Sequence, residues 1–414
     1  MNKLETIVLE NGLTLYLYQD LRRHSTFFQF NTYCGGLTKH FTYQNKEYHL
    51  QDGIAHILEH YIVECNEEGN FLDKLGQMQM STNASTSPII TNYYFETVEN
   101  VEFGIQTILN GVHQVSFDEE KLNRLKNPIY QEIRGKKDNK FYHANRMKLS
   151  QLFTTIDFRD VGGLIEEVSK TTIQDLELLY KAFYHPKNQF IVIAGSFDKE
   201  KVLSIIKDFY QEHSFSNDYG KKIPYEEDLS IFKKEDTLYF PTPKSYYEIS
   251  FKIDFHDFPK EKLLDLDFYL HSFFSCCFGV TSSLHKEFID QKVIIDQINY
   301  GDTIVDHFLI ISIGAYTEKE DIFYEKVMKE IHELNSLDPD KFELDKKSSI
   351  MNLILRDENI FKMIGPFINN IVYYQYPYLD KVEDVQRLTF EDYQEMIHSI
   401  DFSHYSILHI KNKE

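Results

Sequence analysis

A segment near the N-terminus, residues 53–65, carries two histidines and a glutamate in the spacing H-x-x-E-H, at His56, Glu59 and His60. No residue after Gly53 breaks a helix here, so both histidines lie on one helix face, one turn apart, and both imidazoles can reach a single ion. Glu59 then lies beside the ion without binding it, where its carboxylate can take a proton from water that the metal acidifies. The spacing predicts a helix that carries two zinc ligands and a general base.

The same spacing also fits a helix that carries the three residues by coincidence, since the chain has 17 His and 65 Asp plus Glu residues. A catalytic zinc needs a third protein ligand and keeps one position open. Glu132 is the candidate, because it follows Leu125 and Ile129 on the same apolar face of a second expected helix. A carboxylate that points inward there is costly unless it is paired or bound to a cation. The alternative is a glutamate at the rim of that face.

Charge and composition exclude several classes of partner. The formal net charge of −21 disfavours nucleic acid and anionic membrane surfaces. Residues 1–13 lack the apolar core of a signal peptide, and no run of about 18 apolar residues predicts a membrane span. The four cysteines lack C-x-x-C spacing and are interpreted as reduced thiols, at positions 34, 65, 276 and 277. We therefore expect a cytoplasmic protein.

The pattern of strands and helices indicates two domains of the α+β class. Residues 213–229 are polar and show no periodicity, so we interpret them as a linker. The expected domains are a metal-bearing one at 1–212 and a second one at 230–414. The second repeats the order of strands and helices, but its long helix carries His271 with no second histidine or glutamate at ligand spacing. Only the first domain is therefore expected to hold a metal.

Several motifs, taken in order along the chain, resemble the M16 peptidase family (pitrilysin, insulinase, mitochondrial processing peptidase). Residues 53–60 fit G-x-A-H-x-L-E-H, and a glutamate follows about seventy residues later at Glu132. Residues 83–86 fit the family's N-A-x-T edge strand, and residues 184–188 fit Y-x-P-x-N. The resemblance covers nearly the whole chain, is best in residues 1–210, and is closest to small bacterial members of this length.

The resemblance implies two homologous α+β domains, each a mainly antiparallel sheet packed with helices. It also implies a role for each matching residue: Zn²⁺ bound by His56, His60 and Glu132, Glu59 as general base, and Asn83, Ala84 and Ser85 holding an extended peptide as an added strand. Such binding leaves sequence preference loose and requires a short or unfolded peptide as substrate.

The chain departs from the family pattern in two places. The family often has another glutamate seven residues before the third ligand, where this chain has Leu125, which removes an acidic group near the metal. The family's second domain also supplies an Arg and a Tyr that hold the substrate. Ile289 and Asp296 stand at those positions here, and the nearby Tyr300 is out of register.

These features predict a zinc endopeptidase subunit that processes a peptide precursor or leader. The missing Arg and Tyr predict a heterodimer with a homologous subunit that supplies them. The rival interpretation is a scaffold or binding subunit of the same fold with little or no turnover.

Overall fold

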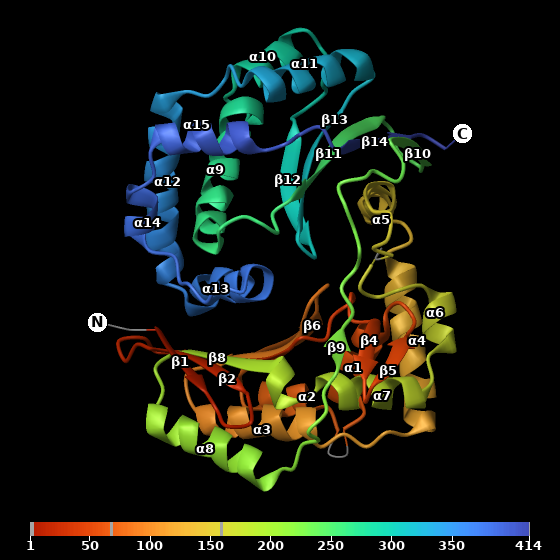
Figure 1. The fold of residues 1–414 in the computed structure, drawn as a ribbon, viewed down its shortest axis with the longest axis vertical. Coiled ribbons are helices and arrows are strands. Elements are labelled where there is room, and N and C mark those ends of the chain that lie inside the picture. The colour runs from red at the N-terminus through yellow and green to blue at the C-terminus, as the bar shows by residue number, and fades with distance from the viewer. Residues whose placement is uncertain (1–3, 67–68, 158–159, 414) are drawn as a thin grey trace. The chain divides into compact units, whose positions relative to one another are not determined.

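The structure is a computed structural model that describes residues 4–66, 69–157 and 160–413, drawn in Figure 1. Internal contacts divide the chain into two compact units. Unit 1 comprises residues 1–136, 160–224 and 359–368, and unit 2 comprises residues 137–159, 225–358 and 369–414. The sequence predicted domains that are continuous in the chain. The structure instead assigns residues 137–159 to the second unit and 359–368 to the first, because these segments pack their apolar side chains there.

The helices and strands of unit 1 are listed here in chain order: β1 Leu4–Val8, β2 Thr14–Gln19, β3 Thr26–Thr32, β4 His40–Tyr43, β5 Lys46–His49, α1 Ile54–Glu64, α2 Phe71–Gln77, β6 Ser81–Thr86, β7 Thr91–Thr97, α3 Val101–His113, α4 Glu119–Gly135, α6 Ile165–Lys170, α7 Ile173–Phe183, the 3-10 turn η1 Pro186–Asn188, β8 Gln189–Gly195, α8 Lys199–Glu212 and β9 Lys221–Lys222. Those of unit 2 are α5 Lys140–Leu152, β10 Glu235–Tyr239, β11 Tyr246–Asp254, α9 Lys260–Phe278, α10 Ser283–Asp290, β12 Asn299–Val305, β13 Phe308–Tyr316, α11 Glu320–Glu333, α12 Pro339–Asp357, α14 Val382–Gln386, α15 Phe390–Ser399 and β14 Tyr405–Lys411. Helix α13, Ile360–Tyr374, contributes residues to both units.

Unit 1 is built on a six-stranded sheet in the order β1-β2-β8-β3-β7-β6. Residues Asn11 and Gly12 form the turn of a hairpin: β1 pairs antiparallel with β2, and Gly12 has φ +93°, which a glycine adopts without strain. Helices α3 and α8 lie together on one face of the sheet (Figure 1). A second, three-stranded sheet, β5-β4-β9, completes the unit.

Unit 2 has a five-stranded sheet in the order β10-β14-β11-β13-β12. Its strands follow the same path as β2, β3, β6, β7 and β8 of unit 1, including one parallel pair, β10 with β14, that matches β2 with β8. All other ladders in both sheets are antiparallel. This shared topology agrees with the predicted α+β class and with two domains of one type.

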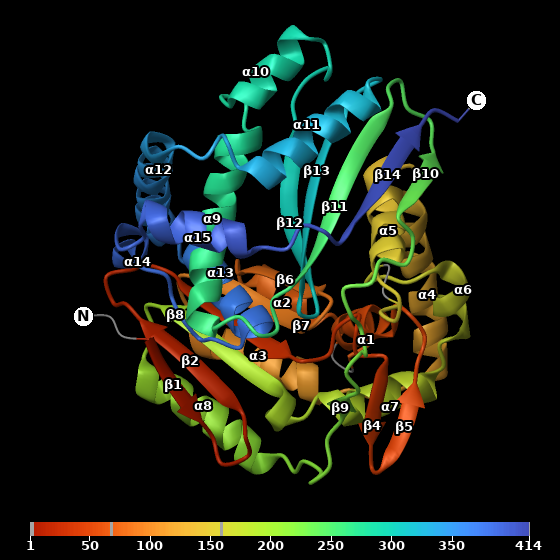
Figure 2. The ribbon, with the colours of Figure 1, turned by 45° about the horizontal axis from the view of Figure 1, so that its top comes forward.

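Helix α9 occupies in unit 2 the place that α1 occupies in unit 1, between the second and third of the shared strands, and it runs beside β12 (Figure 2). The stretch 260–290 contains a segment that is long and apolar enough to cross a membrane by length and composition alone. Most of its apolar side chains are buried in the core of unit 2, as expected for the central helix of a folded domain.

A buried ion pair anchors the segment 154–156 within unit 2. Lys252 Nζ lies 2.5 Å from Glu227 Oε1, and both side chains are 0% exposed. Glu227 also accepts hydrogen bonds from the backbone N–H groups of residues 154, 155 and 156. Burial alone would raise the pKa of Glu227, but the bonds from Lys252 and these N–H groups outweigh it and lower the pKa from 4.5 to about 2.

We predict that Glu227→Gln lowers the free energy of unfolding by about 3 kcal/mol at neutral pH, because it leaves the Lys252 ammonium buried without a counter-ion. Since the pKa is depressed, this difference from wild type should be complete above about pH 4.5 and shrink as the pH falls towards 2. Urea unfolding of both proteins at several pH values measures it. The exposed neighbour Glu226→Gln is the control, and equal losses in both variants would contradict the assignment.

Candidate metal centre

Helix α1 starts at a position that only glycine occupies comfortably. Gly53 precedes the helix with φ +83° and ψ −5°, in the left-handed region. A Cβ at residue 53 would lie 2.6 Å from the carbonyl oxygen of Gly162, so two backbone segments touch there. This contact fixes where α1 begins, and therefore which direction each of its side chains faces.

Three predicted ligand atoms converge in unit 1. His56 Nε2 and His60 Nε2 are 3.2 Å apart. Glu132 Oε2, from α4, lies 3.5 Å from His56 Nε2 and 3.6 Å from His60 Nε2. Within residues 4–66, 69–157 and 160–413, these three residues form the only group of His, Cys, Asp and Glu side chains whose donor atoms all lie within 4.8 Å of one another.

The three donors fit a zinc ion. Tetrahedral zinc with bonds of about 2.0–2.1 Å places its ligand atoms roughly 3.3 Å apart, close to the three separations found here. Two imidazole nitrogens and one carboxylate oxygen are also the donor set of many hydrolytic zinc sites. Three protein donors leave one tetrahedral position for water or substrate.

The charges at the site are arranged to receive a cation. Burial, followed by the neighbouring His60, lowers the pKa of His56 to about 4, so this ligand is neutral. The hydrogen bond with His60 is the main cause that lowers the pKa of Glu132 to about 2, so this ligand is ionised. For His60, burial opposes the charge, but its bonds with Glu132 and Glu64 raise the pKa to about 9. A bound metal would replace that proton.

Neighbouring side chains orient the donors. Glu64 Oε1 lies 2.9 Å from His60 Nδ1 and so fixes the ring with Nε2 directed to the site. Lys136 Nζ lies 3.1 Å from Glu132 Oε1 and holds the carboxylate by its other oxygen. Neither residue was predicted from the sequence to contribute to the site, although both stand four residues after a ligand on the same helix face. Leu125 is 3% exposed and belongs to the core, so Glu64 provides the carboxylate next to a ligand here.

Glu59, the predicted base, is 7% exposed, and its pKa is raised by burial against the opposing hydrogen bond from Thr86. Thr86 Oγ1 donates that bond to Glu59 Oε2 over 2.6 Å. Because Thr86 ends β6, the bond ties the carboxylate to the strand that carries the predicted peptide-binding residues. Thr86 is the last residue of the N-A-x-T motif. That motif was the one feature of the sequence that could have indicated a role for Thr86.

Strand β6 lies at the end of the six-stranded sheet and pairs with β7 alone. Asn83 and Ser85 are exposed along it, and Ala84 lies between them half-buried. Asn83 Oδ1 accepts a hydrogen bond from the Ala84 N–H over 3.0 Å, and Ser85 Oγ accepts one from Asn92. The structure thus places the three predicted substrate residues on an open strand edge next to Glu59.

In unit 2, the positions at which the family resemblance expected Arg and Tyr are both at the surface. Ile289 is 41% exposed near the end of α10, and Asp296 is exposed before β12. Tyr300 lies on β12, where its ring stacks on Phe274 at a centroid distance of 5.1 Å. Neither surface residue provides the cation or phenol that the family pattern places there.

Comparison with known proteins gives the following relatives. The model of the peptidase M16 inactive domain matches residues 170–351, a range that excludes the candidate metal centre. The uncharacterized zinc protease YmfH of Bacillus subtilis (strain 168) is 26% identical over 396 residues, which cover 94% of this chain and 92% of the relative. The zinc protease PqqE of Helicobacter pylori is 20% identical over 378 residues, covering 83% and 82% of the two chains.

Solved structures share the fold. An M16-like chain from Alicyclobacillus acidocaldarius superposes with a TM-score of 0.87 at 21% identity, covering 100% of this chain and 99% of that one. Pitrilysin superposes with a TM-score of 0.73 at 15% identity, and the match covers 100% of this chain but 45% of pitrilysin. The present chain therefore matches slightly less than half of the pitrilysin chain.

The Gly53–Gly162 contact generates a prediction about metal binding. Gly53→Ala should lower the unfolding midpoint and the zinc content together, because the left-handed conformation costs a non-glycine residue about 1–2 kcal/mol and the new methyl group meets a backbone carbonyl. Gly76→Ala in α2, where an added Cβ meets nothing within 4 Å, is the matched control. Thermal unfolding and metal analysis measure both effects. A Gly53→Ala protein that retains full zinc would refute the role given to this contact.

Proposed function

The chain belongs to the M16 peptidase family, and on this premise we propose that it is a zinc-dependent endopeptidase subunit that cleaves short or unfolded peptides. The observation that carries the proposal is the convergence of His56, His60 and Glu132 beside the buried carboxylate of Glu59. Ligands from two helices distant in sequence meet with the spacing that zinc requires, and a base stands next to them. The relatives named zinc proteases support the same activity.

The roles in catalysis follow from position and protonation. Zinc held by His56, His60 and Glu132 supplies Lewis acidity, which acidifies water and polarises a carbonyl. Glu59 accepts the proton of the attacking water and then delivers it to the leaving amine. Its raised pKa suits both steps, because a weakly basic carboxylate would hold the proton too briefly. Thr86 keeps the carboxylate oriented through its hydrogen bond.

The open edge of β6 suits an extended peptide as substrate. A peptide that adds to this edge is held by backbone hydrogen bonds to residues 83–85, so its sequence is read only loosely. A segment that adds to this edge must be extended and free of other backbone partners, which favours a precursor, a leader or another flexible peptide. We place the activity in the cytoplasm on the sequence evidence, and the four cysteines, all free and buried, fit a reducing compartment.

A scaffold function is the second candidate. It is favoured by Ile289 and Asp296, which stand where the family resemblance places substrate-holding Arg and Tyr. In that case the chain would bind peptides or a partner with little turnover.

Two variants separate the base from the ligands. Glu59→Gln should retain zinc but reduce peptide cleavage by roughly 10²–10⁴-fold, because it removes the proton acceptor and no ligand. Glu132→Ala should lose zinc, because it removes one of three ligands. Metal analysis and digestion of a peptide library measure the two properties independently.

The control for these variants is Glu119→Ala, at the exposed start of α4, which should retain both zinc and cleavage. Cleavage by Glu59→Gln near the wild-type rate would refute the proposed base. Wild-type zinc content in Glu132→Ala would remove Glu132 from the site. A wild-type protein that takes up no zinc on reconstitution would favour the scaffold function.

We further propose that the active species is a heterodimer with a homologous subunit. This chain corresponds to 45% of pitrilysin, so a second chain of the same fold would provide the remainder. A second copy of this chain would again present Ile289 and Asp296, whereas a different M16-type subunit can carry Arg and Tyr.

The heterodimer proposal predicts weak cleavage by the isolated chain at all concentrations and a large increase when the homologous partner is added. The measurement is peptide cleavage across a concentration series, with and without homologues encoded by the same source. Full activity of the isolated chain, unchanged by those homologues, would exclude the heterodimer.

A further inference from the structure

One backbone N–H group on the edge of β6 is already bonded within the strand. The Ala84 N–H donates to Asn83 Oδ1 over 3.0 Å. Asn83 is exposed and Ala84 is half-buried, on the strand that ends the six-stranded sheet, so the bond forms where a peptide would add to it. An added strand is held by backbone hydrogen bonds. The side chain of Asn83 therefore occupies a donor that the proposed substrate needs.

The turn after β6 determines which backbone groups of the strand face outward. The Ser87 N–H donates to the Ile90 carbonyl over 2.8 Å, which closes the hairpin between β6 and β7. The groups of successive residues alternate in direction along an antiparallel pair. The odd-numbered residues of β6 therefore bond to β7, and the even-numbered residues Thr82, Ala84 and Thr86 present their N–H and C=O groups to the open edge. Within residues 83–85, the backbone bonds to a peptide thus come from Ala84.

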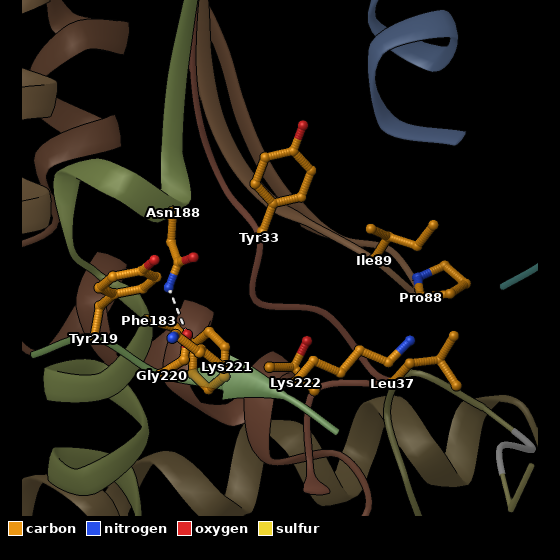
Figure 3. Close-up of a pocket in the computed structure, with 11 residues that line it drawn as sticks. Tyr33, Leu37, Pro88, Ile89, Phe183, Asn188, Tyr219, Gly220, Lys221 and Lys222 are labelled. Atoms are coloured by element: carbon orange, nitrogen blue, oxygen red, sulfur yellow. Dashed lines mark hydrogen bonds between the residues drawn. The ribbon is translucent and has the colours of Figure 1, made fainter. Parts of the chain in front are cut away.

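The turn is held in place by the loop after β3. The Leu37 N–H donates to the Pro88 carbonyl over 2.9 Å. Figure 3 shows Leu37, Pro88 and Ile89 among the residues that line a pocket of about 260 Å³ in unit 1. A strand anchored at its end in this way keeps its register on β7, so the outward direction of the Ala84 N–H is fixed.

The capped N–H lies close to the proposed base along the strand. Thr86, two residues after Ala84, donates to Glu59 Oε2 over 2.6 Å. Two residues of a strand span roughly 7 Å. A peptide that reaches the base along this edge therefore passes Ala84, and the donor occupied by Asn83 lies in the stretch that the substrate has to cover.

We propose that Asn83 is a displaceable cap on the peptide-binding edge: in the free protein its side chain occupies the Ala84 N–H, and it turns away when a peptide pairs there. The inference rests on the proposed peptidase function. An uncovered strand edge can pair with the edge of another chain, and the cap opposes such pairing at the middle of β6.

The cap also favours one class of substrate. A single carbonyl that displaces Asn83 gains one hydrogen bond and loses another. An extended peptide that spans residues 82–86, about five residues long, adds bonds to Thr82 and Thr86 and so gains free energy overall. The edge is therefore closed to isolated polar groups and open to extended segments.

Hydrogen exchange of the Ala84 amide tests the cap without any catalysis, in protein carrying isotope-labelled alanine. Asn83→Ala should speed exchange at Ala84 by roughly five- to tenfold, the equivalent of one hydrogen bond. Asn83→Asp should slow it, because a carboxylate is the stronger acceptor. Ser81→Asp, exposed on the same strand, adds the same charge and is the control. An unchanged rate in Asn83→Ala, or equal slowing in Asn83→Asp and the control, would overturn the cap.

Peptide association tests the displacement. Stopped-flow measurements in the Glu59→Gln background, with and without a homologous partner, use an uncharged fluorescent peptide that is bound without being cut. Asn83→Ala should raise the association rate constant by roughly five- to tenfold, and Asn83→Asp should lower it more than Ser81→Asp does. Bonds that Asn83 makes to a bound peptide affect mainly the dissociation rate, so the association rate isolates the cap. Association by Asn83→Ala at or below the parent rate would refute displacement.

Failure of the cap and failure of the proposed function give different results. Unaltered exchange at Ala84 in the Asn83 variants, in a protein that cleaves peptides, would count against the cap alone. Exchange that follows the predicted order, in a protein that neither binds nor cleaves a peptide with or without a partner, would count against the peptidase and support the cap as protection of the strand edge.

Discussion

The packing of α1 against α4 is the contact on which the candidate metal centre depends. Two histidines one turn apart can hold an ion only if a third donor is brought to them from elsewhere. The apolar face of α4, with Leu122, Leu125 and Ile129 in the core of unit 1, brings Glu132 to that position. Burial of apolar surface thus supplies free energy that holds a carboxylate beside two imidazoles. Lys136 and Glu64 then compensate the charges that this packing brings together.

The two units share a sheet topology but differ in whether the helix beside the edge strand carries a candidate site. Helix α1 and helix α9 follow equivalent strands, yet α1 presents three polar side chains to a site, whereas α9 buries a nearly continuous apolar surface. The exposed His271 has no second histidine or glutamate at ligand spacing on α9. The fold therefore positions a helix next to an edge strand in both units, and only the side chains decide whether chemistry is possible there.

Local spacing allowed the sequence to predict much of the site. His56, Glu59 and His60 share one helix, so their common direction was foreseeable. For Glu132 the apolar periodicity left two alternatives, an inward carboxylate or one at the rim of the face. The structure places it at the exposed rim, where its Oε2 still lies 3.5 Å and 3.6 Å from the two histidine Nε2 atoms. The hydrogen bond from Thr86 to Glu59 was not foreseeable from spacing, because it joins α1 to β6, two elements that meet only in the folded domain. The segment 137–159 was expected in the first domain, because it follows α4 directly. Its place in unit 2 is determined by contacts such as that of Gln151 with Ile407, far apart in the chain.

The position of α5 also bears on how the chain folds. Gln151 donates from its buried side chain to the carbonyl of Ile407 on β14, a partner 256 residues away. During synthesis, α5 leaves the ribosome long before β14 does. Its apolar side chains therefore stay without their packing partner while the unit 1 segments before and after α5 in the chain are made. Contacts between residues so distant in sequence form slowly. Until they form, the exposed apolar side chains of α5 can associate with other chains. Unit 2 therefore reaches its native packing only after β14 has been made, and neither unit corresponds to a fragment obtained by a single cut.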